Sequence, residues 1–139
     1  MPRFVLVGLM ALFLAAASPA SAAPVTAWHA HLARAGISGT VTVSITNAAA
    51  GGTLVMDVRG LTPRTLSDLW LRGGSCSATR YGVTHVRWTV PANGHLVLTV
   101  PLAPAWAGYF LYDMAHRGGA HATLTDGSRQ ACAMLVVGR

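Results

Sequence analysis

Five side chains that could ligate copper are spread along this chain of 139 residues. His29 and His31 lie two residues apart in "TAWHAHLA", so on a strand both imidazole rings would project from one face at a spacing that can chelate. Met114, His116 and His121 lie in "DMAHRGGAH", and sulfur together with imidazole suits copper(I). The same residues also fit a simpler interpretation, with solvent-facing histidines and Met114 in the core. A copper-binding function is therefore the alternative, and we favour a protein without a cofactor.

No arrangement for nucleophilic or acid–base catalysis is recognisable in the sequence. The chain has no G-x-S-x-G motif, and "RGGSC" lacks the lysine and the helix that a phosphate-binding P-loop needs. The four aspartates show no local pairing of the kind that a glycosidase uses. Asp68 and Arg72 share a strand face, and we expect a modest surface ion pair between them. This pattern favours a protein that is not an enzyme.

The charged residues are restricted in type and dispersed in position. Every basic residue is an arginine and every acidic residue an aspartate, ten and four respectively, and the formal net charge is +6. The arginines form no run, whereas a nucleic-acid-binding surface would be expected to cluster basic residues and to interleave aromatic ones. We therefore predict no nucleic-acid partner.

The first 22 residues have the composition of a secretory signal peptide. Arg3 is followed by an apolar run from Phe4 to Ala17 and by the small residues of "ASA" at 20–22, after which we place the cleavage site. The apolar run is shorter than the roughly 18 residues expected of a spanning helix, although a retained signal anchor is the competing interpretation. We predict export to the periplasm or the extracellular space, with one domain at 23–139 and no membrane span in it.

The chain contains two cysteines, Cys76 and Cys132. In an exported chain an even pair of cysteines is typical of a disulfide, and their spacing fits no C-x-x-C motif. The competing interpretation is two unpaired buried thiols. A bridge between them would stabilise the domain by roughly 4 kcal/mol at most through the entropy of the unfolded chain.

Beyond residue 22 the hydrophobic pattern has a period of two along most of the chain, which is typical of half-buried strands. The alternation predicts about eight strands, at residues 26–33, 37–46, 53–61, 67–72, 85–90, 95–102, 108–114 and 130–137. The sequence "PANG" at 91–94 is the strongest hairpin signal, since Asn-Gly tolerates the backbone angles of a tight turn. We predict an all-β fold, an eight-stranded antiparallel Greek-key barrel or sandwich with one disulfide.

Three stretches resemble a known superfamily. "VRGLTPRTLSDLWLRGGSC" and "DGSRQACAML" are similar, in order and spacing, to segments of the copper/zinc superoxide dismutase-like domains and the related CHRD domains, and "AGYFLYDM" resembles a strand of the short bacterial members. The resemblance extends over roughly residues 25 to 137. It implies a disulfide between Cys76 and Cys132 and an eight-stranded Greek-key barrel.

The departures from that superfamily concern its metal ligands. Trp70 and Arg72 stand where the superfamily has His-x-His, and Met114 stands where a later strand carries a histidine. Neither an indole nor a protonated guanidinium can ligate copper. Superoxide dismutase activity is therefore not expected. Arg129 aligns with an arginine that guides superoxide in the enzymes, and here we expect it to brace a loop.

These observations together predict an exported domain with a binding or structural role at the cell envelope. Trp70 and Arg72 are the candidate contact residues, because aromatic and arginine side chains on one strand face are typical of interfaces. The partner would be a protein or another envelope component. A side chain of Trp70 covered by a loop is the competing interpretation.

Overall fold

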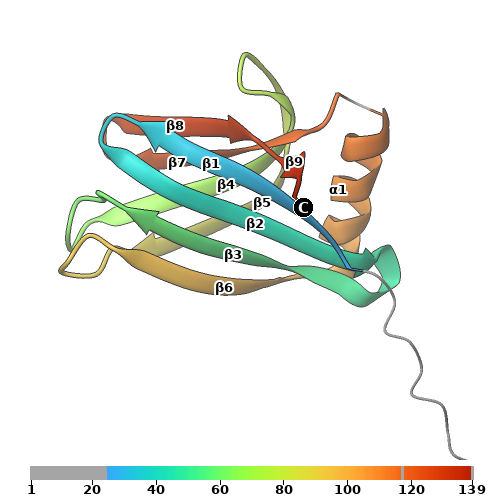
Figure 1. Ribbon diagram of the computed structural model, residues 1–139, viewed down its shortest axis with the longest axis horizontal. Helices are drawn as coiled ribbons and strands as arrows, with labels where there is room; N and C mark the ends of the chain where they lie inside the picture. Colours follow the sequence, from blue (N-terminus) through green and yellow to red (C-terminus); the bar gives the residue numbers. More distant parts are fainter. Residues whose placement is uncertain (1–24, 117, 139) are drawn as a thin grey trace, which may run out of the picture.

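The computed structural model describes residues 25–116 and 118–138, without the side chains of 78–81 and 83. Two antiparallel sheets pack face to face in it, and a single helix lies across one end (Figure 1). The predicted signal peptide lies outside the described residues. Within the described part of the chain, no helix is both long and apolar enough to cross a membrane.

Five strands form the first sheet, which we call sheet A. Its order is β6-β3-β2-β1-β9, and every neighbouring pair is antiparallel. The bounds are Thr26–Arg34 for β1, Ile37–Asn47 for β2, Gly51–Arg59 for β3, Leu96–Leu102 for β6 and Val136–Val137 for β9. Between β2 and β3 the chain makes one turn of 3₁₀ helix, η1, at Ala48–Ala50, where the Asn47 side chain accepts a hydrogen bond from the Ala50 amide.

Four strands form the second sheet, sheet B, in the order β5-β4-β7-β8. The bounds are Leu66–Ser75 for β4, Ala78–Thr89 for β5, Ala120–Asp126 for β7 and Arg129–Met134 for β8. The chain leaves sheet A after β3, forms the β4–β5 hairpin in sheet B, and returns to pair β6 with β3. This crossing makes the fold a Greek-key sandwich, as predicted. The two sheets do not close into a barrel, although β1 and β8 lie close together at one side.

The core lies between the inner faces of the two sheets, where the residues that alternate inward are apolar. Val41 and Val43 of β2 and Leu54 and Met56 of β3 are completely buried there. Leu69 and Leu71 of β4 face them from sheet B and are equally buried. The period of two in the sequence therefore reports correctly which face of each strand is covered.

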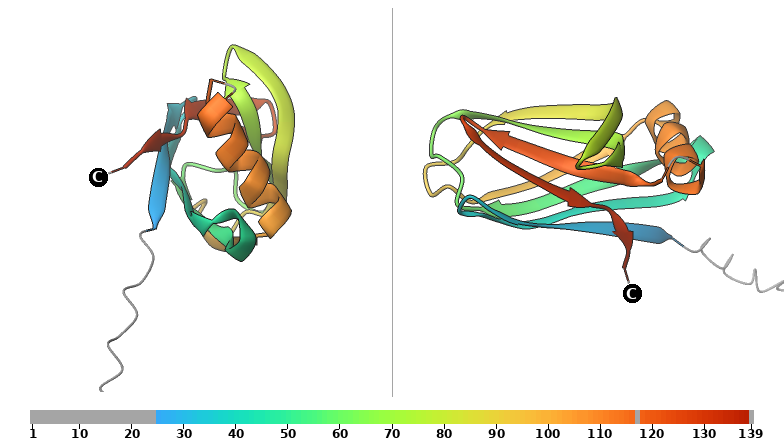
Figure 2. Two further views of the ribbon diagram at one scale, coloured as in Figure 1. Left: turned by 90° about the vertical axis from the view of Figure 1, so that its right-hand side faces the viewer. Right: turned by 90° about the horizontal axis from the view of Figure 1, so that it is seen from above.

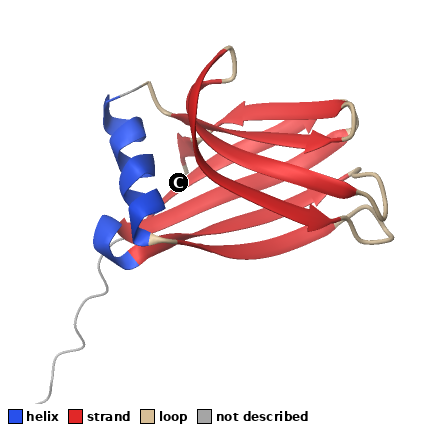
Figure 3. Ribbon diagram, turned by 180° about the vertical axis from the view of Figure 1, so that it is seen from behind, coloured by secondary structure: helices blue, strands red, loops and turns tan. Residues whose placement is uncertain are grey.

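The prediction of a strand at 108–114 is wrong, since these residues belong to the helix α1, Pro104–His116. Figures 2 and 3 show α1 closing one end of the sandwich. Its inward side chains, Ala107, Phe110, Leu111 and Met114, are spaced by three, one and three residues, which is a helical repeat. The sequence pattern is misleading here because Phe110, Tyr112 and Met114 are two residues apart, which also fits one face of a strand. Phe110 packs edge-on against Trp28 of β1, with ring centroids 5.0 Å apart.

Two further differences concern the C-terminal third of the chain. Strand β7 was not predicted, because its sequence "AHATLTD" has small and polar residues where long apolar ones would have marked a face. The single strand expected at 130–137 is two strands in different sheets, β8 and β9, separated by the buried Leu135. In addition, Gly73 and Gly74 belong to β4, so the turn begins after Ser75 and not at the glycine pair.

Candidate binding surface on sheet B

The candidate contact residues lie on the outer face of sheet B. Along β4, Ser67, Leu69 and Leu71 point into the core, so Asp68, Trp70 and Arg72 point away from it. All three outward side chains are partly exposed. Strand β4 is flanked by β5 on one side and β7 on the other, so Trp70 stands in the middle of the sheet and not at an edge.

Trp70 is held by two neighbours. His85 of β5 is its cross-strand partner, and the two rings are stacked with centroids 4.1 Å apart and an angle of 5° between their planes. The guanidinium carbon of Arg72 lies 4.8 Å from the centre of the Trp70 ring, which is within the range of a cation–π contact. Gly82 gives the ring room, since a Cβ at this position would come within 2.7 Å of it. The half-buried indole is therefore fixed in one orientation.

Asp68 connects this stack to a second arginine. Its Oδ1 atom lies 2.7 Å from Nε2 of His85 and accepts a hydrogen bond of 2.8 Å from Nε of Arg87. The hydrogen bond from Arg87 is the main reason that the pKa of Asp68 is lowered, and His85 adds to it. The carboxylate is therefore ionised at neutral pH and orients both partners.

The prediction of an ion pair between Asp68 and Arg72 is wrong. Residues four apart on a strand are separated by roughly 13 Å, whereas directly opposed residues on neighbouring strands are about 5 Å apart. Arg87 is the residue opposite Asp68 in the register of β4 and β5, so it takes the carboxylate. Arg72 lies against the Trp70 ring instead.

Polar side chains continue this face beyond β4. Thr123 and Thr125 of β7 stand opposite Trp70 and Asp68, and Gln130 of β8 stands opposite Thr125. The hydroxyl group of Thr123 donates a hydrogen bond of 3.3 Å to Sγ of Cys132. We call the set Asp68, Trp70, Arg72, His85, Arg87 and Thr125 the Trp70 surface.

The disulfide between Cys76 and Cys132 is formed, as predicted. The two Cα atoms are 5.9 Å apart, and the bridge ties the end of the β4–β5 hairpin to β8. His121 is completely buried on β7, where its Nδ1 atom lies 3.0 Å from the carbonyl oxygen of Gly74. This histidine therefore has a structural partner inside the fold.

The five candidate copper ligands lie on three different elements, β1, α1 and β7. His29 and His31 lie on the outer face of sheet A, where Nδ1 of His29 is 2.9 Å from the hydroxyl oxygen of Thr42. Met114 packs against the core, His116 lies beside Tyr112 at the end of α1, and His121 is buried in sheet B. Among the residues that the structure describes, no three His, Cys, Asp or Glu side chains form a group that could hold a metal ion.

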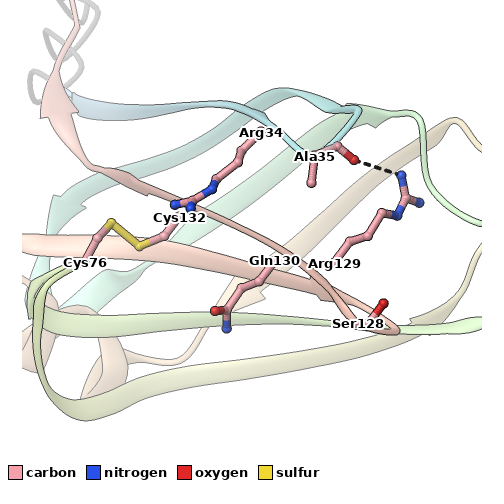
Figure 4. A pocket seen from close by; sticks show the side chains of 7 residues that line it. All are labelled: Arg34, Ala35, Cys76, Ser128, Arg129, Gln130 and Cys132. Atoms are coloured by element: carbon pink, nitrogen blue, oxygen red, sulfur yellow. Dashed lines mark hydrogen bonds between the residues drawn. A yellow bond between two sulfur atoms is a disulfide. The ribbon is translucent and has the colours of Figure 1, made fainter.

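A polar pocket of about 420 Å³ lies beside the disulfide, between the end of β1 and β8 (Figure 4). The residues that line it are Arg34, Ala35, Cys76, Ser128, Arg129, Gln130 and Cys132. Arg129 donates hydrogen bonds to the carbonyl oxygen of Ala35, at 3.2 Å, and to the hydroxyl group of Thr62, at 3.1 Å. It therefore braces the β1–β2 turn and the loop that precedes β4, as the sequence predicts.

Arg129 is itself held by a buried carboxylate. Asp126 is only 2 % exposed and forms an ion pair with the Arg129 guanidinium. It also accepts hydrogen bonds of 2.8 Å from the Thr62 amide and 2.9 Å from the Ser67 hydroxyl. Burial by itself raises the pKa of Asp126, but the hydrogen bonds from Thr62, Ser67 and Arg129 outweigh it and lower the pKa below its ordinary value.

No protein-family model matches this chain, and no curated protein matches it either. The resemblance to superoxide dismutase-like and CHRD domains therefore stays a prediction.

Sequence reasoning found Trp70 and Arg72 but missed His85, Arg87 and Gly82. The alternation at 85–90 does place His85 and Arg87 on the outward face. The alternation does not give the register between β4 and β5. That register depends on where β5 begins, at Ala78, and on irregularities at Leu71, Arg72 and Gly74 that shift the pairing.

Proposed function

We propose that this protein is an exported domain that acts by binding and not by catalysis, and that the Trp70 surface contacts its partner. The observation that carries the proposal is the stack of Trp70 with His85 and Arg72 on the outer face of sheet B. Aromatic and arginine side chains dominate the energetics of interfaces. Because the stack is already formed without a partner, little side-chain entropy would be lost when the partner binds.

The charges of the surface indicate the kind of partner. Arg72 and Arg87 carry two positive charges, of which Asp68 balances one. Thr125 adds a hydroxyl group beside them. A protein or another envelope component with acidic or hydrogen-bond-accepting groups fits this surface, because arginine binds carboxylates and phosphates in a directed manner.

Two features support a location in the periplasm or outside the cell. The N-terminal 22 residues have the composition of a signal peptide, and disulfides such as that between Cys76 and Cys132 are typical of oxidising compartments. Within the resemblance to superoxide dismutase-like and CHRD domains, Trp70 and Arg72 replace two metal ligands. We therefore propose that the partner binds at the position where superoxide dismutase-like domains carry these metal ligands.

Photo-crosslinking in the exporting cell tests the proposal. A photoreactive phenylalanine analogue at Thr125, next to Asp68, is expected to give a discrete crosslinked product. The double variant Trp70→Ala/Arg72→Ala is expected to lose that product, because it removes both halves of the stack. The Gly82→Ala variant is expected to weaken it, because the added methyl group displaces the indole without removing it.

The matched control places the same photoreactive residue at Thr99, an exposed position of β6 on the outer face of sheet A. A product that forms equally from Thr99 and Thr125, or that persists in the double variant, would contradict the proposal. The mass of the protein recovered from the periplasm or the medium tests export, and we expect it to begin at Ala23.

A further inference from the structure

The helix α1 carries a row of aromatic side chains on its outer side. Trp106, Tyr109 and Tyr112 are 41 %, 55 % and 49 % exposed, and successive members are three residues apart. The Trp106 and Tyr109 rings lie 6.1 Å apart, and Tyr112 lies 4.8 Å from the ring of His116. The four rings therefore form two neighbouring pairs, one in the first half of the helix and one in the second. We call these four residues the α1 aromatic row.

The outer side of this helix is also free of charged carboxylates. The one acidic residue of α1, Asp113, is buried and packs against Gly73 of β4. The rest of the solvent-facing side consists of proline, alanine and glycine besides the aromatic row. A soluble helix ordinarily presents charged residues to water. A helix that instead presents tryptophan and tyrosine matches the boundary between lipid headgroups and acyl chains, where these amphipathic rings concentrate.

The position of α1 in the fold points the same way. Strand β1 begins at Thr26, opposite Ile45 near the end of β2, and the following turn η1 packs on α1. The described chain therefore starts at the end of the sandwich that α1 covers (Figures 1 and 2). The 24 residues that precede it include the apolar run from Phe4 to Ala17. Until the predicted cleavage after Ala22, this run would hold the end of the domain that bears α1 close to the bilayer during export.

From the aromatic row, the lack of exposed acid on the helix and its place in the fold, we infer that α1 binds the surface of a bilayer that contains anionic phospholipid. Trp106, Tyr109 and Tyr112 insert their rings at the headgroup level, and the positive net charge of the domain at 23–139, which has nine arginines and four aspartates, attracts it to the anionic surface. The α1 aromatic row is distinct from the Trp70 surface on sheet B. The inference therefore does not depend on the proposed partner.

Co-sedimentation with vesicles tests the inference. The exported, oxidised protein is mixed with vesicles of phosphatidylcholine that contain about a quarter phosphatidylglycerol, at moderate salt. Binding is expected, and the triple variant Trp106→Ser/Tyr109→Ser/Tyr112→Ser is expected to reduce the partition coefficient by about tenfold or more. The matched control is Leu66→Ser/Val97→Ser, which removes two exposed apolar side chains from the sheets and is expected to bind like the wild type.

A second variant keeps the result interpretable if the triple variant folds poorly. Trp106→Phe retains an aromatic ring but removes the one of the four tryptophans that lies on α1, so binding is expected to persist while quenching of tryptophan fluorescence by brominated lipid is lost. Trp70→Ala is expected to retain both binding and quenching, which separates this surface from the Trp70 surface. Three results would overturn the inference: no binding to any vesicle, quenching that survives Trp106→Phe, or binding that the triple variant leaves unchanged.

Discussion

Sheet B holds two aspartate–arginine pairs whose surroundings differ. Asp126 and Arg129 lie at the end of the β7–β8 hairpin, where the carboxylate is buried and bound by Thr62 and Ser67 as well. Asp68 and Arg87 lie on the open face, where their side chains are 26 % and 57 % exposed. A buried charge with several hydrogen bonds holds the fold together, whereas an exposed pair contributes little to stability and stays available to a partner.

The contrast also explains why two positions of similar chemistry have different expected roles. Asp126 connects the loop before β4 to the β7–β8 hairpin, so its loss would free segments that are far apart in the sequence. Asp68 connects only neighbouring strands that the β4–β5 ladder already joins. We therefore expect substitutions at the first pair to affect folding and substitutions at the second to affect recognition.

The largest effect is expected from Asp126→Ala. This change leaves the Arg129 guanidinium and the Ser67 hydroxyl without their buried acceptor, which is expected to lower the free energy of unfolding by about 3 kcal/mol. Urea denaturation followed by circular dichroism measures the loss. The control is Asp57→Ala, at a 60 % exposed carboxylate on β3 that contacts His95, for which a change below about 1 kcal/mol is expected. Equal losses in the two variants would refute the contrast between buried and exposed carboxylates.

A smaller effect is expected in the acid range. The pKa of Asp126 is lowered from its ordinary value of 3.8, so the folded protein binds this proton more weakly than the unfolded chain does. The corresponding stability is fully present above the ordinary pKa and is lost as the pH falls through the lower pKa of the folded state. Urea midpoints measured from neutral pH to about pH 2 are expected to fall less steeply for Asp126→Asn than for the wild type below about pH 4. If the urea midpoints of the variant and the wild type fall equally steeply in acid, another group controls acid unfolding.

The smallest effect on stability is expected from Asp68→Asn. The pair with Arg87 is exposed and already embedded in a strand ladder, so the free energy of unfolding is expected to change by less than about 1 kcal/mol. Crosslinking at Thr125 is nevertheless expected to decrease, because Asp68 orients His85 beneath Trp70. A large loss of stability, or unchanged crosslinking, would assign Asp68 to the fold and not to the surface.

Much of the sandwich could be predicted from the sequence because a half-buried strand has an apolar side chain at every second residue. The segments that became β1, β2, β3 and β6 alternate strongly, and their predicted limits fall within about two residues of those in the structure. The prediction of strands failed where this alternation is weak. Strand β7 has alanines on its inner face, and α1 has aromatic residues on both sides, so that a period of two and a period of 3.6 fit equally well.

The candidate site was predictable in part. The parity of 67–72 placed Asp68, Trp70 and Arg72 on one face, and this is how they lie. Their contacts were not predictable, because Trp70 meets His85 and Asp68 meets Arg87 only through the register of β4 against β5. A shift of that register by one residue would turn different side chains toward them.

The sequence by itself determined the all-β class, the disulfide between the two cysteines, and which face of most strands is covered. These properties follow from local periodicity and from the number of cysteines, which need no knowledge of distant contacts. The tertiary structure alone decided that Arg129 binds Asp126, that the copper candidates lie apart, and that residues 104–116 form a helix with an exposed aromatic row. The physical reason is that these outcomes depend on which distant segments pack together, and only the folded chain sets those contacts.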